Sequence, residues 1–202
     1  PASAPRASDL VAVRLDDPDL CPRYTARVVS GVKIGPSPDW LKNALEKIGI
    51  RSISNVVDVT NYVLLEMGQP LHAFDLAKLT GGIEARFANK GERIKLLNEQ
   101  TVEVDGEVGV IADDAGVEAL AGIMGGDATA VSLDTRNIYV EAAFWWPEAI
   151  QGRSRRFGCR LIGSCPFLFR DRLCLCGRSC FCIGVRPCFL GSLGQLSRAL
   201  LL

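Results

Sequence analysis

The sequence predicts an α+β fold in which helices come early and a mostly antiparallel sheet follows. Helical periodicity is confined to residues 38–68 and a short segment near residue 150, while short alternating segments separated by turn residues fill residues 83–143. The sequence contains no internal repeat. A chain of 202 residues, 48% hydrophobic and 23% charged, is long enough for one domain with a buried core.

A strand and a helix are expected first. Residues 24–29 alternate polar and apolar side chains rich in good β-formers, which predicts a half-buried strand. Ser37 then occupies the position of a helix N-cap, with Pro38 at the first helical position and Gly49 as the closing residue. The apolar side chains of this helix share one face: Trp40, Leu41, Ala44, Leu45 and Ile48.

A second helix and a run of strands come next. The helix should begin near Ser54 or Asn55 and end around Gly68, and its many β-branched residues require tertiary packing to hold it. A last helix should start after Trp146-Pro147 and run to about Arg156. Between them, turn sequences separate the expected strands 83–87, 93–97, 101–104, 108–112, 118–123 and 137–143.

The chain joins two different compositions. Residues 1–158 carry 17 Lys+Arg against 22 Asp+Glu, whereas residues 159–202 carry six Arg against the single acid Asp171. Seven of the eight cysteines lie in the second part, and the lone Cys21 of the first part suits a reducing, intracellular setting. We therefore expect a linker over residues 1–20, a domain over residues 21–158 and an anomalous, irregular tail over residues 159–202.

The tail has two explanations. Leu, Arg, Cys, Gly and Ser dominate it, and arbitrary reading of GC-rich codons yields these residues, so residues 159–202 fit an out-of-frame translation. The alternative is a genuine hydrophobic tail. Its cysteines form no Cys-x-x-Cys pair and it contains no histidine, so no metal site is expected. Arginines interrupt every apolar run before it reaches about 18 residues, so no membrane span is expected.

The most informative stretch is Arg51–Val63 followed by Gly68–Asp75, which brings a cation, several hydrogen-bonding side chains and the only histidine within 25 residues. The segment SNVVDVTNYVLLEMGQPLHAFD closely resembles the editing and tRNA-binding domain of the bacterial phenylalanyl-tRNA synthetase beta chain. Further matches to this family are Gly122-Ile-Met-Gly-Gly126, Val140–Phe144 and Ile150–Gly158. The resemblance runs from about Arg23 to Gly158, and it implies a single editing-type domain cut from a much larger protein.

His72 and Glu141 are the catalytic candidates. On the residues alone, His72 lies in a proline-containing turn, where an imidazole either pins the turn to a carbonyl or serves a site. Glu141 lies in an apolar strand, where a charged carboxylate needs either a structural salt bridge or a ligand. The resemblance implies that His72 lines the pocket where the wrong aminoacyl ester is hydrolysed by water. It also implies that Glu141 reads the phenolic hydroxyl of tyrosine.

Arg51, Thr60, Asn61 and Gly125 are the substrate-binding candidates. Thr60 and Asn61 offer hydrogen-bonding groups on the second helix, and Arg51 is a cation for a phosphate or the ester region. The resemblance places Gly125 where the backbone approaches the amino-acid side chain. Capping or solvated roles for the first three, and a plain tight turn for the glycine, remain alternatives.

The cations Arg153, Arg155 and Arg156 are the tRNA-binding candidates. Such a cluster is usually a solvated helix face, but the acceptor end of a tRNA needs cations against its phosphates, and the resemblance implies that it binds here. The rest of the domain is mildly acidic, so contact with RNA should be local.

The resemblance implies a fragment of the phenylalanine–tRNA ligase beta subunit that binds tRNA and, in the intact family, hydrolyses tyrosine misacylated on phenylalanine-specific tRNA during protein biosynthesis. Its expected partners are tRNA and the synthetase alpha subunit, with no DNA and no membrane, in the cytoplasm. No cofactor and no metal are expected in this domain, since ATP and magnesium belong to the complete synthetase.

Two other functions remain open. Leu161 and Gly163 stand where the family has a threonine and an alanine, and leucine cannot donate a hydroxyl hydrogen bond. The chain would then be a non-catalytic tRNA-positioning or subunit-packing module. The third possibility is a nonfunctional product of a shifted reading frame, whose tail aggregates through exposed Leu, Phe and Cys.

Overall fold

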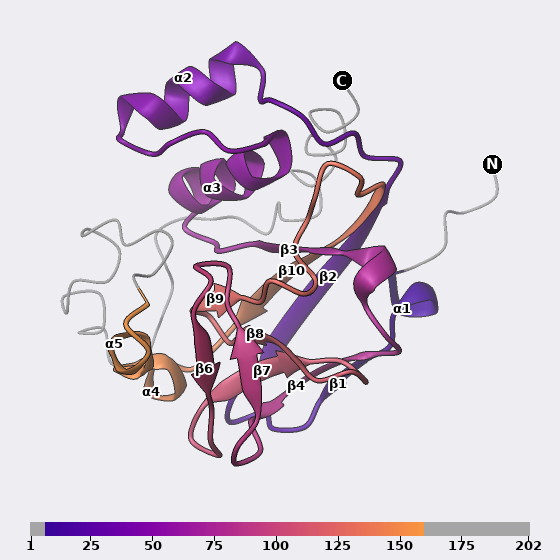
Figure 1. Ribbon diagram of the computed structural model, residues 1–202, viewed down its shortest axis with the longest axis vertical. Helices are drawn as coiled ribbons and strands as arrows, with labels where there is room; N and C mark the ends of the chain where they lie inside the picture. Colours follow the sequence, from indigo (N-terminus) through magenta and orange to yellow (C-terminus); the bar gives the residue numbers. More distant parts are fainter. Residues whose placement is uncertain (1–6, 160–202) are drawn as a thin grey trace.

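The computed structural model describes residues 7–159 of the chain (Figure 1). The helices of this range are α1 (Ala7–Leu10), α2 (Asp39–Lys47), α3 (Asn55–Met67), the 3-10 helix η1 (Leu76–Lys78), α4 (Pro147–Ile150) and α5 (Arg153–Arg156). The strands are β1 (Val13–Leu15), β2 (Arg23–Ser30), β3 (His72–Asp75), β4 (Ile83–Phe87), β5 (Arg93–Lys95), β6 (Thr101–Glu103), β7 (Gly109–Ala112), β8 (Val117–Leu120), β9 (Met124–Gly125) and β10 (Asn137–Phe144). The tail beyond Cys159 lies outside the described residues.

Two sheets and a small hairpin form the β part of the described domain. The larger sheet has the strand order β1-β4-β7-β8-β9, and the smaller sheet has the order β2-β10-β3. All neighbouring strands are antiparallel except β1 and β4, which run parallel. Strands β5 and β6 pair separately as an antiparallel hairpin. The predicted α+β fold with early helices and a mostly antiparallel sheet is confirmed.

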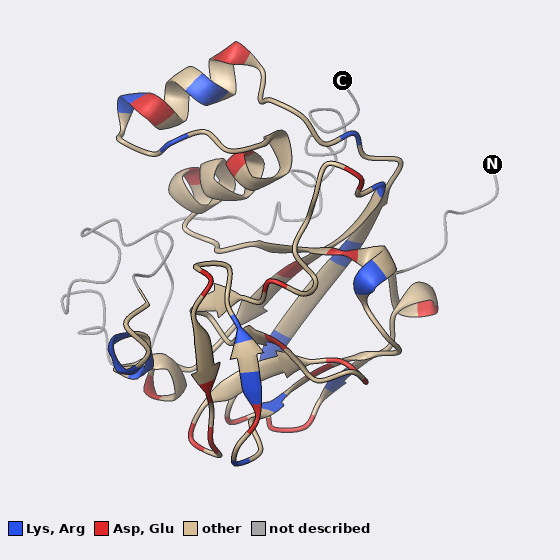
Figure 2. Ribbon diagram, viewed as in Figure 1, with Lys and Arg blue, Asp and Glu red and all other residues tan. Residues whose placement is uncertain are grey.

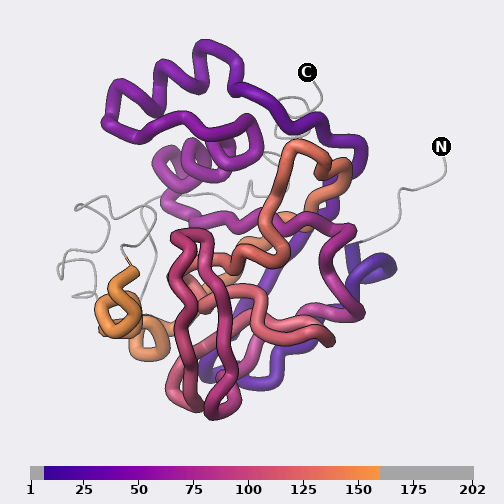
Figure 3. The backbone as a smooth tube through the Cα atoms, in the orientation of Figure 1, coloured from indigo at the N-terminus to yellow at the C-terminus, as the bar shows by residue number. Residues whose placement is uncertain are grey.

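The smaller sheet lies between the larger sheet and the long helices. Because side chains alternate across a strand, one face of β10 carries Tyr139, which packs with Ile111 and Ala119 of the larger sheet. The other face carries Ile138, which packs with Val56 of α3. The described domain is therefore layered as helices, small sheet and large sheet, and α2 and α3 gather at one end of it (Figures 1 and 3).

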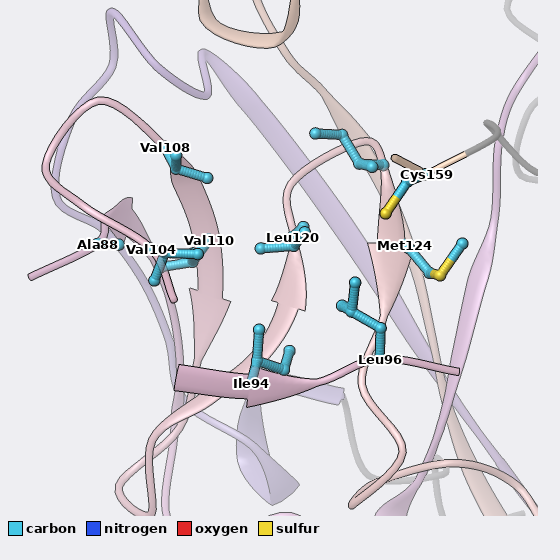
Figure 4. Packing of buried hydrophobic residues seen from close by; sticks show 10 residues of the cluster. Ala88, Ile94, Leu96, Val104, Val108, Val110, Leu120, Met124 and Cys159 are labelled. Carbon is cyan, nitrogen blue, oxygen red and sulfur yellow. The ribbon is translucent and has the colours of Figure 1, made fainter. Parts of the chain in front are cut away.

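The outer face of the larger sheet is covered by the β5–β6 hairpin. Ile94 and Leu96 of the hairpin segment pack against Val110 and Leu120, and Cys159 closes the edge of this cluster (Figure 4). Leu96 and Val110 are fully buried. This second core lies on the far side of the sheet from the His72 strand, so it stabilises the platform on which the candidate site rests.

Helix α3 has the ends that the sequence predicts. The Ser54 side chain accepts a hydrogen bond from the backbone N–H of Val57, and Gly68 closes the helix in the left-handed conformation with φ 71°. The predicted cap of the preceding helix is wrong. Pro38 is the N-cap residue of α2, and the buried Ser37 hydroxyl donates to the carboxylate of Asp58.

Four further predictions are corrected. His72 does not lie in a turn but opens β3, because β10 offers it a pairing edge. The strand expected over residues 118–123 divides into the β8–β9 hairpin, whose turn contains Gly122 with φ 64°. The last helix is broken between α4 and α5 by Gly152, whose φ is 82°. Strand β1, placed in the linker by composition, pairs with β4 and belongs to the sheet.

No helix within residues 7–159 combines the length and the apolar character that crossing a membrane would require.

Candidate functional site

The fold brings His72 and Glu141 together although 69 positions separate them in the sequence. They are directly opposite partners in the antiparallel pairing of β3 with β10, so their side chains project from the same face of the small sheet. The next pair on this face, Phe74 and Tyr139, is fully buried against the larger sheet. The two catalytic candidates therefore face the layer between the sheets.

This layer contains polar atoms that have no partner. Within the described residues, the buried side-chain nitrogen and oxygen atoms without a hydrogen bond are Tyr24 Oη, His72 Nε2, Tyr139 Oη and Glu141 Oε2. We call these four residues the polar cluster. Strand register places all of them on the same face of the small sheet. Burying a polar group without a partner is costly, so four in one place is typical of a binding site.

For His72 and for Glu141 the sequence left a structural role and a role in a site open, and the geometry can be compared with each. His72 Nε2 does not pin a turn to a carbonyl, because it has no hydrogen-bond partner. Glu141 is 6% exposed and forms no ion pair within residues 7–159, so it is not part of a structural salt bridge there.

Burial sets the protonation of the polar cluster. Removal from water lowers the pKa of His72 to about 4 and raises the pKa of Glu141 to about 8. Burial, followed by the negative charge of Glu141, also raises the pKa of Tyr24, and burial raises that of Tyr139 to about 12. Near pH 7 these shifts favour a neutral imidazole, which can accept a hydrogen bond, opposite a protonated carboxyl group, which can donate one.

Gly125 of β9 lies against the imidazole of His72. A β-carbon added at Gly125 would come within 2.2 Å of His72 Cε1 and 2.5 Å of Nε2. The structure therefore places Gly125 beside the catalytic candidate, where only a residue without a side chain leaves the ring in position. Gly122 lies in the turn before it, with Trp145 as its nearest neighbour.

Replacing Gly125 by alanine should displace the His72 ring and lower the free energy of unfolding by about 1–3 kcal/mol, the usual cost of overpacking a buried position. Urea denaturation monitored by tryptophan fluorescence measures this loss. Gly35→Ala is the matched control, since a β-carbon there meets nothing within 4 Å. Equal stability of the two variants would show that the close approach of Gly125 to His72 is wrong.

Arg51, Thr60 and Asn61 are not joined to the polar cluster by any contact in the part of the chain that the structure describes. The Thr60 hydroxyl donates to the carbonyl of Val57 within α3 at 2.7 Å. Asn61 is half-buried on the same helix, and Arg51 is exposed in the segment before it. Helix α3 packs on the face of the small sheet opposite to His72.

The three arginines expected to bind tRNA differ in their surroundings. Arg156 pairs with both carboxylate oxygens of Asp105, and Arg153 donates to backbone carbonyls, including that of Glu148 at 2.6 Å. The Arg155 side chain is exposed and forms no hydrogen bond or ion pair within residues 7–159. Figure 2 shows α5 as a basic segment at the periphery of the described domain.

Tyr24 and Tyr139 are not among the site residues that the sequence motifs predict. The available signal was the two-residue period of the strands, because Tyr139 precedes Glu141 by two positions and must share its face. Tyr24 could not be placed before the β2–β10 register was known, since its partner there is Ala143. Within residues 7–159 no group of three or more His, Cys, Asp and Glu side chains is arranged to hold a metal ion.

Comparisons with known proteins agree with this architecture. Residues 20–164 match the B3/4 domain family. The chain is 59% identical over 150 residues to the phenylalanine–tRNA ligase beta subunit of Cupriavidus pinatubonensis, covering 74% of this chain and 18% of the relative. It is 54% identical over 161 residues to the same subunit of Ralstonia nicotianae, covering 78% of this chain and 20% of the relative. The chain thus spans about a fifth of the length of these curated relatives.

A solved structure shares the fold. The crystal structure of an N-terminal fragment of the phenylalanyl-tRNA synthetase beta-subunit from Pyrococcus horikoshii superimposes with a TM-score of 0.52 at 17% sequence identity, covering 74% of this chain and 47% of that one. The resemblance that the sequence motifs indicated is confirmed. The chain belongs to the B3/4 domain family and is homologous to phenylalanine–tRNA ligase beta subunits.

Proposed function

We propose that this chain hydrolyses the ester of a wrongly aminoacylated tRNA, and that its substrate is tyrosine attached to phenylalanine-specific tRNA in the cytoplasm. One observation carries the proposal. His72 Nε2 and Glu141 Oε2 are buried, unpartnered and on directly opposite positions of β3 and β10. The names of the homologous ligase subunits support the choice of an aminoacylated tRNA as substrate.

The chemistry requires only water and groups already in the site. The neutral imidazole of His72 accepts a hydrogen bond from water and orients it toward the ester carbonyl carbon. The water oxygen forms the new bond to that carbon, the bond from the carbon to the ribose oxygen breaks, and a proton from water ends on the ribose oxygen. Positioning supplies most of the effect, so neither a metal nor a covalent nucleophile has a role in this proposal.

Glu141 provides the choice of amino acid. A buried polar group that pairs with a phenolic hydroxyl is left unpaired when phenylalanine enters, which discriminates strongly between two side chains that differ by one hydroxyl. We further propose that Arg155, and Arg51 near the start of α3, meet phosphates of the tRNA, since both are exposed and neither side chain is paired with another described residue. The synthetase alpha subunit is the proposed protein partner.

Deacylation of tyrosine from mischarged tRNA tests the proposal. His72→Ala should slow the reaction by about a hundredfold to ten-thousandfold, because a positioned acid or base contributes about that much. Glu141→Ala should abolish the preference for tyrosine over phenylalanine. Glu66→Ala, which removes an exposed carboxylate on α3, should leave both rate and preference unchanged. Full activity of the His72 and Glu141 variants would show that the site is elsewhere.

A second function is favoured by one feature of the sequence. Leu161 and Gly163, which stand where the family has threonine and alanine, lie outside the described residues. If these positions complete the pocket, the chain binds tRNA without cleaving the ester. Binding of the mischarged tRNA with no release of tyrosine would favour this positioning role over hydrolysis.

A further inference from the structure

An exposed aromatic pair lies at the end of β10. Phe144 is 41% exposed, and Trp146, two residues further on, is 43% exposed. Their rings meet edge to face with centroids 5.4 Å apart. The backbone N–H of Trp146 donates to the carbonyl of Leu20 at 3.3 Å, which fixes the backbone that carries the second ring. Large apolar side chains that are gathered on a surface, rather than scattered over it, mark an interaction site.

Two arginines share the face of the small sheet that carries Phe144. Arg23 of β2 is directly opposite Phe144, and Arg27 lies four positions further along β2 on the same face. The pair between them, Thr25 and Ala142, consists of small side chains. Neither guanidinium group forms an ion pair within residues 7–159. The positive charge beside the aromatic pair is therefore not neutralised by a described residue.

Helix α3 covers the other half of this face. Ile138 and Val140 of β10 pack with Val56 of the helix. Ala142 and Phe144, further along the same strand, belong to none of the buried clusters of residues 7–159. The strand positions of this uncovered half include two arginines and no acid. The described domain thus presents an open surface that is both aromatic and basic.

The chemistry of this surface favours single-stranded RNA. Unpaired bases stack on exposed aromatic rings and on guanidinium planes, and arginines meet the phosphates between the bases. Duplex RNA is disfavoured, because its bases are already stacked within the helix and offer no free faces. An acidic peptide would match the charge and leave the rings unused, whereas an apolar protein surface would cover the rings and leave the arginines without partners.

We propose that Phe144, Trp146, Arg23 and Arg27 form a platform for single-stranded RNA, on which bases stack against the two rings and phosphates meet the two arginines. This inference rests on the proposed function for the source of the strand, a tRNA, and deepens it by naming where unpaired nucleotides of that tRNA are held. Phe144 follows Glu141 by three positions, about 10 Å along β10, so the platform lies beside the candidate site on the opposite face of the sheet.

Short oligonucleotides test the platform without any ester. The 202-residue chain is titrated with fluorescein-labelled hexa-adenylate RNA and with an abasic strand of the same length, which keeps the phosphates and lacks the bases. Fluorescence anisotropy measures both affinities. We expect hexa-adenylate to bind at least tenfold more tightly than the abasic strand. Trp146→Leu and Phe144→Leu should each weaken hexa-adenylate by about fivefold to a hundredfold, the effect of one lost stacking contact, and leave the abasic strand unchanged.

Salt dependence tests the two arginines. Arg23→Gln and Arg27→Gln should each weaken both strands, because both strands carry the phosphates. Each substitution should also reduce the slope of the logarithm of the affinity against the logarithm of the salt concentration by about 0.7, the contribution of one cation to binding a single strand. A merely structural role for these arginines would not change this slope.

Matched controls come from elsewhere in the described domain. Trp40→Leu removes another exposed tryptophan, which is 56% exposed and meets Tyr62 edge to face. Arg93→Gln removes an arginine that already pairs with Glu103 at 3.0 Å. Both should leave the affinities and the salt slope as they are. The arginines of residues 160–202 are present in every variant, so differences between variants report the platform. Should one aromatic variant not fold, as checked by circular dichroism, the other decides.

Three results would overturn the inference: no binding of hexa-adenylate, equal binding of the abasic strand, or unchanged affinity in the aromatic variants. The exposed rings would then belong to a protein interface. These results are separate from the fate of the proposed function. A chain that binds hexa-adenylate through Trp146 and cleaves no ester retains the platform but is not a hydrolase. A chain that deacylates tyrosyl-tRNA and binds hexa-adenylate no better than the abasic strand is a hydrolase that holds its substrate by other residues.

Discussion

Replacing Asp58 by alanine is expected to lower the free energy of unfolding by about 3–5 kcal/mol, because its carboxylate joins three separate donors. The side chain is completely buried in α3. It accepts hydrogen bonds from the hydroxyls of Ser37 and Ser52 and from the backbone N–H of Ile53 at 2.9 Å. Alanine would leave all three donors unpaired, and it would detach the segment before α2 from the start of α3.

Chemical denaturation measures this loss of free energy of unfolding, and two further variants serve as comparisons. Asp58→Asn keeps the shape and one carbonyl oxygen, and the serine hydroxyls can rotate to accept from its amide, so it should cost less than alanine. Glu66→Ala removes an exposed acid from the same helix and should change stability by less than about 0.5 kcal/mol. A loss below about 1 kcal/mol for Asp58→Ala would contradict the role assigned to this carboxylate.

The N-cap predicted at Ser37 is wrong because local sequence rules do not include partners that are distant in the sequence. Ser37 followed by Pro38 has the local pattern of a helix start, and the helix does form there. The Ser37 hydroxyl instead donates a hydrogen bond to the buried carboxylate of Asp58, which is 21 positions away in the sequence. Arg156 likewise has a long-range partner, since it pairs with Asp105, 51 positions away. Long-range partners of this kind are invisible to periodicity.

Three residues of the candidate site were predictable from the motifs, but Tyr24, Tyr139 and the geometry were not. The motifs identified His72, Glu141 and Gly125, and the structure gathers these three. Their proximity depends on the register between β3 and β10, and β3 itself was mistaken for a turn because its four residues are too few to show a period. Without β3, His72 cannot be placed opposite Glu141, so neither this pairing nor the complete polar cluster could be derived from sequence.

The stability of the folded chain should have a plateau between about pH 4.5 and 6.5 and fall as the pH rises toward 8. Burial raises the pKa of Glu141 to about 8, so its contribution is fully present below its ordinary pKa of 4.5 and is lost as the pH rises through 8. Burial lowers the pKa of His72 to about 4, so its contribution is present above 6.5 and is lost as the pH falls toward 4. Between about pH 4.5 and 6.5 the contributions of Glu141 and His72 to stability change with pH in opposite directions and cancel. Above pH 6.5 only the contribution of Glu141 still changes.

Glu141→Gln isolates the carboxyl group, because glutamine resembles the protonated form at every pH. The stability of this variant relative to the unchanged chain should increase by roughly 1.4 kcal/mol per pH unit from about pH 4.5 to 8, and several kcal/mol in total. Urea denaturation across this range measures the difference, with Glu66→Gln as a control that replaces an exposed acid. A constant difference would mean that Glu141 is ionised in the folded chain across this range. The site would then hold a carboxylate rather than a neutral donor, and the phenolic hydroxyl of a tyrosyl ester would have to donate to it.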